Sequence, residues 1–510
     1  MAPEQDNVFW LDGATGARFP ALAHDCTVDV AIIGAGMVGL HCAWALHDQG
    51  LRVAVVEARR IGRQATGRST AKVTSQHGLC YAQIARDFGD EGARIHAREN
   101  ERALGLVADL SARIGDQAAF ERRDAYVYAT DDTEANPLQQ EAEAARRAGL
   151  AARLDQAVPA PVDAVAALRF PDQGQFDPFG YLQGLAGMLA EHVQIFEESR
   201  VTAVKPGQPC EIRVNGHIVR AGVVVVSTQI PVIPEGHFFA KTFPFAHPVA
   251  AAPLPEGITI DGMFVSAGSP GRSLRTARRG SQTFLVAAGR SFSPCARDAE
   301  REAIDDLRGF LNARFGIANP SHLWTNEDFR PMDGAAFIGP ADRRHPNLLI
   351  ATGFAAWGLT QGAVAGDILA SLARGREHPA AALYDATRHK PIAGGATFLR
   401  KNIKAGAHLV GDRLLNRKTV ELSDIGPGTG GVIVRDGEKL AVRRDASGKI
   451  AALSAICKHM GCVVDWNATD RTWDCPCHGS RFDAQGAVLT GPATAPLEPR
   501  SLGDGEKDGA

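Results

Sequence analysis

Two short segments near the C-terminus constrain this chain more than any other feature. The first is residues 457–462 (CKHMGC) and the second is residues 475–480 (CPCHGS). Cys457-x-His459 supplies one thiolate and one imidazole, and Cys475-x-x-His478 supplies a second such pair. Two thiolates and two imidazoles are a common ligand set for a bound metal centre. The sequence therefore predicts a metal site held by two loops with a strand-like insert between them.

This pattern resembles the Rieske family, in which one iron of a [2Fe–2S] cluster takes two thiolates and the other takes two imidazoles. The resemblance implies four ligands: Cys457, His459, Cys475 and His478. The Gly-Ser pair at 479–480 and a later Gly491-Pro492 resemble the cytochrome bc-type branch more than the oxygenase branch. That branch carries an additional cysteine pair, which implies a disulfide between Cys462 and Cys477.

One position departs from the bc-type pattern. Two residues after Ser480, where that branch usually has Tyr, this chain has Phe482. A Tyr hydroxyl there donates a hydrogen bond to a ligand sulfur, so Phe predicts a lower reduction potential. The alternatives are a structural zinc site, which also uses Cys2His2, and four unrelated core residues. Zinc would leave Cys462 and Cys477 without a role.

The chain has 510 residues, enough for about three domains. Its net charge of −3 gives no reason to expect a nucleic-acid partner. No secretory signal and no apolar run long enough to span a membrane is evident, and the other five cysteines are isolated. We expect a cytoplasmic protein, with a membrane-peripheral location as the alternative because residues 393–418 are rich in Lys and Arg.

A dinucleotide-binding fingerprint stands near the N-terminus. An apolar strand at 27–33 leads into GAGMVG at 34–39, a helix to about residue 48, a second strand at 52–56, and Glu57. Glycines at 34, 36 and 39 suit the tight turn, the approach of the pyrophosphate and helix–strand packing. The nucleotide-binding residues expected here are Gly34, Gly36, Met37, Gly39 and Glu57, the last for the adenosine ribose.

The fingerprint, together with a polar loop at 62–78, resembles the D-amino-acid oxidase and glycine oxidase superfamily of FAD enzymes. The resemblance implies that Ser69 and Thr70 contact FAD, and that Lys72 or His77 lies near the flavin. An ordinary solvated loop is the alternative. In the strand-rich stretch at 243–285, Arg272 and Arg275 would point to opposite faces of one strand, so at most one could bind a substrate carboxylate. A surface arginine without a role is the alternative there.

A second block, at 333–339 and 347–362, resembles the superfamily's C-terminal flavin motif. A strand at 348–352 is followed by a turn and by a helix from 358 to about 374, whose N-terminus would stabilise the reduced flavin. The residues expected at the flavin are Gly353, Gly358, Leu359 and Thr360, with Trp357 over the ring or in the core. Relatives that bind FAD covalently use a Cys before this block, and none lies between 320 and 339, so non-covalent FAD is expected.

These segments predict three parts. Residues 1–395 form an FAD-dependent oxidoreductase, with an α/β Rossmann-like FAD-binding domain (about 26–80, 190–230 and 330–390) and an inserted α+β substrate domain. Residues 396–418 are a linker, and residues 419–505 form a small all-β Rieske domain with Gly-rich turns. No second strand–GxGxxG–helix unit occurs, which argues against a nicotinamide-fed reductase.

The functional hypothesis is an oxidoreductase that takes a hydride from a small amine or amino acid to FAD. Electrons would then pass singly to the [2Fe–2S] cluster and on to an external acceptor such as a quinone, a ferredoxin-like protein or oxygen. His77, Arg275 and Trp357 are the pocket candidates, and no catalytic base is assigned. The alternative is an electron-transfer protein whose flavin is reduced by a partner. A Rieske oxygenase would need a mononuclear iron domain, and the chain has no segment for one.

Overall fold

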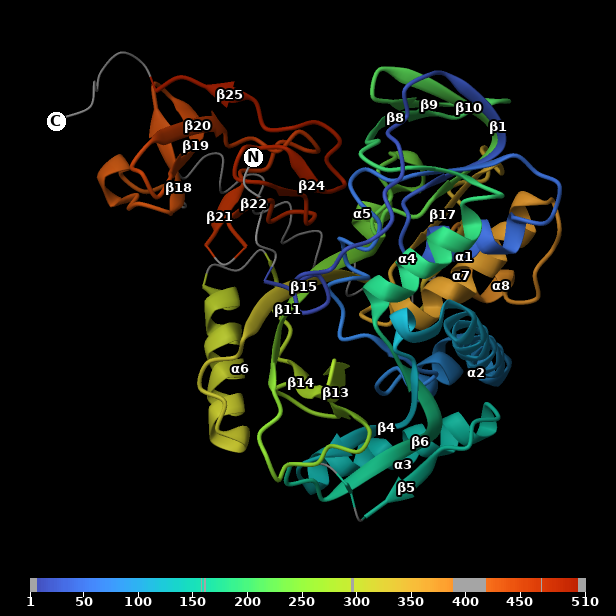
Figure 1. The fold of residues 1–510 in the computed structure, drawn as a ribbon. Coiled ribbons are helices and arrows are strands. Elements are labelled where there is room, and N and C mark those ends of the chain that lie inside the picture. The colour runs from blue at the N-terminus through green and yellow to red at the C-terminus, as the bar shows by residue number, and fades with distance from the viewer. Residues whose placement is uncertain are drawn as a thin grey trace.

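A computed structural model describes residues 7–156, 158–159, 162–294, 298–388, 419–468 and 470–502. The expected linker at 396–418 lies outside these residues. The described chain forms three parts, two large sheets with their helices and a C-terminal all-β domain (Figure 1). This is the fold class that the sequence predicts.

The first sheet has eight strands and a mainly parallel core. Its principal order is β16-β17-β10-β1-β2-β7, and β8–β9 pair onto β10. Helices α1 (Met37–Leu46) and α7 (Gly358–Ala373) pack on each other beside it, together with α4 (Pro178–Leu189). The strands are β1 (Cys26–Ile33), β2 (Val53–Val56), β7 (Gln194–Phe196), β8 (Val201–Lys205), β9 (Cys210–Val214), β10 (His217–Val226), β16 (Phe337–Pro340) and β17 (Leu348–Thr352).

Strand β10 corrects one expectation. The sequence suggests separate strands at 217–220 and 223–228, but the structure has one strand. Its register with β1 is unbroken from the Cys26–Val219 pair to the Ile33–Val226 pair. The strand continues through Ala221 and Gly222 because it pairs in parallel with the buried strand β1 along this length.

The second sheet has nine strands and lies mainly in the region where the sequence predicts an inserted substrate domain. Its order is β15-β11-β14-β13-β12-β4-β6-β3, with β5 on β6. Helices α3 (Asp132–Arg147) and α6 (Ala299–Phe315) pack on it. The strands are β3 (Lys72–Val73), β4 (Glu121–Ala129), β5 (Arg153–Asp155), β6 (Ala166–Gln175), β11 (Thr242–Pro253), β12 (Met263–Ser266), β13 (Ser273–Arg279), β14 (Gln282–Ala288) and β15 (His322–Pro331).

Helix α2 (Tyr81–Ile114) is divided at Gly89, whose φ of 78° and ψ of 167° are not helical. Its second part agrees with the helical spacing of residues 90–110, whose strongly charged face predicts a solvated surface. The surface expected to be solvated also has a buried side, which carries Glu99 and Asn100. Short helices are η1 (Gly115–Ala118), η2 (Glu235–His237), α5 (Phe238–Lys241), α8 (Ala381–Tyr384) and η3 (Leu422–Asp424). No helix in the described ranges is both long and apolar enough to cross a membrane.

The C-terminal domain consists of two four-stranded antiparallel sheets. Its own core contains Trp473 and Phe482, both fully buried. In Figure 1 this domain (orange to red) lies beside the first sheet, and β11 and β15 run close to it. The strands are β18 (Gly430–Arg435), β19 (Glu438–Arg444), β20 (Ile450–Ser454) and β25 (Pro499–Arg500), then β21 (Asp465–Asn467), β22 (Thr472–Asp474), β23 (Arg481–Phe482) and β24 (Val488–Thr490).

Candidate flavin and iron–sulfur sites

The loop between β1 and α1 has the geometry of a phosphate-binding turn. Gly34 has φ +103°, and a Cβ there would lie 2.7 Å from the carbonyl oxygen of Ser227. A Cβ on Gly39 would lie 1.9 Å from the carbonyl oxygen of Gly34. Because both obstacles are backbone atoms, only glycine fits at these two positions. The turn therefore brings the N-terminus of α1, with its free N–H groups, close to the strand ends.

A cleft with about 1300 Å³ of space, including its open mouth, begins at this turn. It runs past the end of β10, at Ser227 and Thr228, to the start of α7. The size and the course suit an extended dinucleotide cofactor. Seven of the expected cofactor-binding residues line it: Gly34, Gly36, Met37, Glu57, Ser69, Gly358 and Leu359.

Glu57 lies at the end of β2 and holds the turn together. Its Oε2 accepts a hydrogen bond from the backbone N–H of Ala35 (2.9 Å), and its Oε1 accepts one from that of Arg59 (3.0 Å). Each carboxylate oxygen has a second lone pair for a ribose hydroxyl. The position and the remaining acceptor capacity fit the expected contact with the adenosine ribose.

Four other expected residues do not line the cleft but contact the elements that do. Gly39 makes the close helix contact, and Gly353 packs against Pro331 with φ +80°. Thr360 accepts a hydrogen bond at Oγ1 from the backbone N–H of Thr74 (2.8 Å), which ties α7 to the polar loop. Thr70 accepts one at Oγ1 from Lys72 Nζ (2.9 Å). These residues position the lining rather than form it.

Lys72, on β3, is a buried cation that ties the polar loop to the second sheet. Its ammonium donates hydrogen bonds to Thr70 and to Ser273 on β13, so it links the loop to the second sheet. Burial, with the nearby charge of Arg275, lowers the pKa of Lys72 to about 7. A lysine of this kind is able to exchange a proton near neutral pH.

His77 and Trp357 lie together, but neither is among the residues that line the flavin cleft. The His77 ring stacks on Trp357 with centroids 5.0 Å apart, and Trp357 precedes the first residue of α7. His77 Nδ1 is 3.3 Å from His96 Nε2, and His96 Nδ1 is 2.8 Å from the hydroxyl of Tyr384. Burial lowers the pKa of both imidazoles, to about 4 for His96, so both are neutral at pH 7.

Arg275 has a different environment from the other two pocket candidates. As expected for residues three positions apart in a strand region, Arg272 and Arg275 face apart, and Arg272 pairs with Asp306 of α6. The guanidinium of Arg275 donates to the backbone carbonyls of Ala71 (2.8 Å) and Phe176 (3.3 Å) and lies over the ring of Trp10. These contacts hold the polar loop, so Arg275 supports the cleft structurally rather than presenting a fork for an anion.

The predicted cluster ligands come from two matching turns. The N–H of Gly461 donates to the carbonyl of Cys457 (2.9 Å), and the N–H of Gly479 donates to that of Cys475 (3.1 Å). The rings of His459 and His478 lie side by side, with centroids 5.0 Å apart. Both Nδ1 atoms are buried and make no hydrogen bond to any residue that the structure describes. Two buried nitrogens without partners on the same side of two turns fit imidazole ligands of a metal centre.

The thiols complete the donor set. Cys457 and Cys475 are unbridged and buried, and the hydrogen bond from Cys475 lowers the pKa of Cys457 to about 7. Within the described ranges, two groups of three possible ligands lie close together: His77, Cys80 and His96, and Cys462, Cys475 and Cys477. The second cannot hold an ion, because Cys462 and Cys477 are bonded to each other, and the four predicted ligands form no such group. Two separated pairs suit a two-iron centre better than a single tetrahedral zinc.

The expected disulfide is present. Cys462 and Cys477 are bonded, and the bond joins the two ligand turns. Phe482 is fully buried in the domain core, on β23. Ser480, two residues earlier, accepts a hydrogen bond at Oγ from the N–H of Ala493 (3.0 Å), which connects the second ligand turn to the loop of Gly491 and Pro492.

The two histidine rings of the cluster site face the flavin domain. Phe239 of α5 meets the ring of His459 edge-on at 4.8 Å between centroids and that of His478 at 5.1 Å. A Cβ on Gly479 would lie 2.7 Å from Glu327 Oε1 on β15. The cluster site is thus enclosed by the oxidoreductase part of the same chain.

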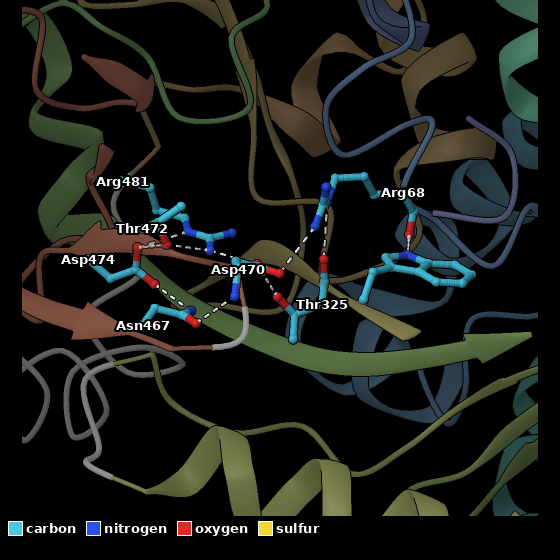
Figure 2. Close-up of polar contacts among 8 residues, drawn as sticks. Arg68, Thr325, Asn467, Asp470, Thr472, Asp474 and Arg481 are labelled. Carbon is cyan, nitrogen blue, oxygen red and sulfur yellow. Dashed lines mark hydrogen bonds and ion pairs between the residues drawn. The ribbon is translucent and has the colours of Figure 1, made fainter. Parts of the chain in front are cut away.

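A polar network fixes this arrangement (Figure 2). Asp470, after β21, accepts hydrogen bonds from Thr325 Oγ1 (2.5 Å) on β15 and from Arg481 Nη2 (2.7 Å) on β23. Arg68 of the polar loop lies 3.6 Å from Asp470 and donates to the carbonyl of Thr325 (3.1 Å). Although burial opposes ionisation, Arg481 and Arg68 lower the pKa of Asp470. The flavin loop, β15 and the cluster domain therefore share one charged contact.

Strand β15 separates the two sites. Successive residues of a strand point to opposite faces. Asn326 and Asp328 line the flavin cleft, whereas Thr325 and Glu327 line a second cavity between the domains. Burial raises the pKa of Asp328 to about 6 and that of Glu327 to about 8. One face of β15 thus lines the flavin cleft, and the other faces the Rieske domain, where Glu327 lies against the ligand turn at Gly479.

Comparison with known proteins agrees with this structure. The family model described as FAD dependent oxidoreductase matches residues 29–372, and the one described as Rieske [2Fe-2S] domain matches residues 417–500. The chain therefore belongs to the FAD-dependent oxidoreductase family and carries a C-terminal Rieske domain. It binds FAD and a [2Fe–2S] cluster, as the sequence predicts.

A full-length relative has the same organisation. A Rieske 2Fe-2S iron-sulfur protein of Bacillus subtilis, YhfW, is 30% identical over 500 residues, covering 98% of each chain. Among solved structures, glycine oxidase from Geobacillus kaustophilus has a TM-score of 0.60 at 16% identity, covering 72% of this chain and all of its own. L-proline dehydrogenase from P. horikoshii has a TM-score of 0.59 at 20% identity, covering 72% of this chain and 98% of its own. These structural likenesses establish the fold.

The sequence gives no sign of several residues at the junction. Phe239, Asp328, Thr325 and Asp470 stand in segments without a recognisable motif. Their placement depends on contacts between residues more than 80 positions apart. No local pattern in a single sequence could have identified them.

Proposed function

We propose that this protein oxidises a small amine or amino acid at its FAD and passes the electrons through its Rieske cluster to an external acceptor. Support for C–N bond oxidation comes from the fold, on which glycine oxidase and L-proline dehydrogenase are also built. That support is an analogy of fold, because sites rather than folds determine chemistry.

The observation that supports electron transfer between the cofactors is the position of strand β15, which borders the flavin cleft and contacts the Rieske domain. Asn326 and Asp328 line the flavin cleft while Thr325 holds the Rieske domain through Asp470. FAD accepts two electrons as a hydride, whereas the cluster carries one at a time. Because one chain holds both cofactors, electron transfer from the reduced flavin to the cluster is favoured over reaction of the reduced flavin with other molecules.

The chain's own residues have defined tasks in this scheme. The N-terminus of α7 presents its positive dipole end at Gly358, where negative charge develops during reduction. Trp357 and His77 stack on each other at the start of α7, and the imidazole of His77 is neutral at pH 7 because burial lowers its pKa. Lys72 is the group beside the loop that is able to take up or release a proton near pH 7. Correct placement of a neutral amine then supplies most of the catalysis.

An anaerobic spectral titration with a panel of amines and amino acids tests the proposal. We expect one compound class to bleach the flavin band and reduce the cluster together. Bleaching of the flavin while the cluster stays oxidised over many turnovers would refute the relay. Bleaching only by a reduced protein partner, and by no compound of the panel, would instead establish an electron-transfer protein without its own organic substrate.

The acceptor is tested with the same reduced protein. We propose a one-electron acceptor, either a quinone or a ferredoxin-like protein, with oxygen as the third candidate. The cluster is expected to be reoxidised faster by one of the first two than by air. Fast reoxidation of the flavin by oxygen with the cluster still reduced would identify an oxidase.

A further inference from the structure

Three residues of the Rieske domain line the FAD cleft. Leu489 and Thr490, at the end of β24, and Gly491 lie in the same cleft wall as Ser227 to Gln229 and Val232 of the oxidoreductase part. Leu489 and Thr490 are only half-buried, so their side chains have room to contact a bound molecule. Nothing in the structure of the flavin domain alone could supply these groups.

This part of the wall is held firmly from both domains. A Cβ on Gly491 would lie 2.9 Å from Val232 Cγ1, so the backbone of Gly491 packs closely against the side chain of Val232. Thr490 pairs with Arg481 across β23 and β24, and Arg481 bonds Asp470, which in turn bonds Thr325 of β15. Arg200, another lining residue, is in electrostatic contact with Asp483 of the Rieske domain.

We propose that Leu489, Thr490 and Gly491 are part of the FAD-binding site, so that FAD binding and docking of the Rieske domain stabilise each other. The cofactor would lie between an apolar side chain and a hydroxyl group of one domain and the phosphate-binding turn of the other. The proposal rests on the assignment of FAD to the cleft and requires no substrate. Its failure would therefore leave the proposed amine oxidation untouched.

Thermodynamic linkage makes the proposal quantitative. If FAD binds the docked state more tightly, any change that weakens docking weakens FAD binding by the same free energy. Couplings of this kind are typically roughly 5- to 150-fold in affinity. The same loop also connects to the cluster, since Ala493 donates to Ser480 beside the ligand turn. Binding of FAD is thus expected to stabilise the docked Rieske domain, which carries the cluster.

Hydrogen–deuterium exchange on the unaltered full chain is the first test. The protein is prepared with its cluster and without FAD, and exchange is compared before and after FAD is added. We expect slower exchange in a peptide covering 486–493 as well as in one covering 34–39. Protection of 34–39 without any change at 486–493 would overturn the proposal.

Three variants measured by FAD titration provide the second test. Leu489→Ala removes the apolar contact, Thr490→Trp fills the cleft, and Asp470→Asn weakens the docking network. We expect each to raise the Kd for FAD at least about fivefold, while the exposed control Lys449→Gln leaves it unchanged. The paramagnetic spectrum of the reduced cluster reports whether the Rieske domain is folded. Wild-type FAD affinity in the variants that keep this spectrum would refute the proposal.

Discussion

Alanine at Gly39 and at Gly36 should affect the protein in two separate ways. A Cβ on Gly39 would lie 1.9 Å from a backbone carbonyl oxygen, and α1 would have to move by more than 1 Å to restore a normal contact. A Cβ on Gly36 would meet only Thr66 Oγ1, at 3.4 Å, which is an ordinary contact. Gly39→Ala should therefore lower the stability of the fold, whereas Gly36→Ala alters the surface that a pyrophosphate approaches.

The expected magnitudes follow from these distances. Overpacking against fixed backbone costs about 3 kcal/mol, which lowers the Tm of a domain of this size by roughly 6 °C. Gly36→Ala should leave the Tm of the FAD-free protein within about 1 °C, since it costs less than about 0.5 kcal/mol. Its lost close approach to a charged phosphate should weaken FAD binding by about 1.5–3 kcal/mol, or roughly 10- to 150-fold.

The assay combines thermal unfolding of the FAD-free protein with FAD titration by fluorescence. Gly105→Ala, in α2, is the matched control, because a Cβ there meets nothing within 4 Å. We expect it to leave FAD affinity unchanged and to stabilise the protein by about 0.5–1 kcal/mol. The steric reasoning is wrong if Gly39→Ala unfolds at the wild-type temperature, or if Gly36→Ala binds FAD as tightly as the wild type.

Further outcomes are expected at three other places. Phe482→Tyr should raise the reduction potential of the cluster, because the new hydroxyl donates a hydrogen bond that favours the reduced state. The expected rise is about 60 mV for each 1.4 kcal/mol of that preference. A reduction potential, measured by voltammetry, at or below the wild-type value would contradict this. Replacing both Cys462 and Cys477 by Ser removes the cross-link between the ligand turns, which should cost about 3 kcal/mol for a separation of 15 residues and speed loss of the cluster absorbance on heating. Lys72 has a lower pKa folded (about 7) than unfolded (10.5), so the unfolded state binds more protons between these values and stability should rise with pH across that window. Lys72→Met should flatten this part of a Tm-against-pH curve, and an unchanged slope would show that Lys72 is not the group responsible.

Much of the fold could be predicted because its signals are local. The strand–turn–helix at 27–46 and the strand–turn–helix at 348–373 carry apolar runs interrupted by glycines, and both are found as expected. Where the sequence misled, tertiary contact had overridden a local break. This holds for β10, which runs on through Ala221 and Gly222 beside β1. In α2, by contrast, the non-helical Gly89 does divide the helix, and its second part covers the helical pattern that begins at residue 90.

The candidate sites divide in the same way. Gly34 and Gly39 are recognisable because a single missing Cβ decides whether the turn can form. The role of Arg275 could not be recognised, because its position on a strand does not say which groups its guanidinium contacts. In the structure those groups are the carbonyl oxygens of Ala71 and Phe176. Spacing along a strand determines the face of the sheet and not the partner across it.

The sequence by itself determined the cofactors, because the ligand spacings of the two turns and the glycines of the phosphate loop are steric and chemical requirements satisfied within a few residues. Only the tertiary structure decided that the two cofactor sites adjoin. That arrangement depends on Phe239, on Thr325 with Asp470, and on the loop at 489–491, all of which meet across long stretches of chain. Such contacts are set by how whole domains pack, and a local sequence pattern carries no information about them.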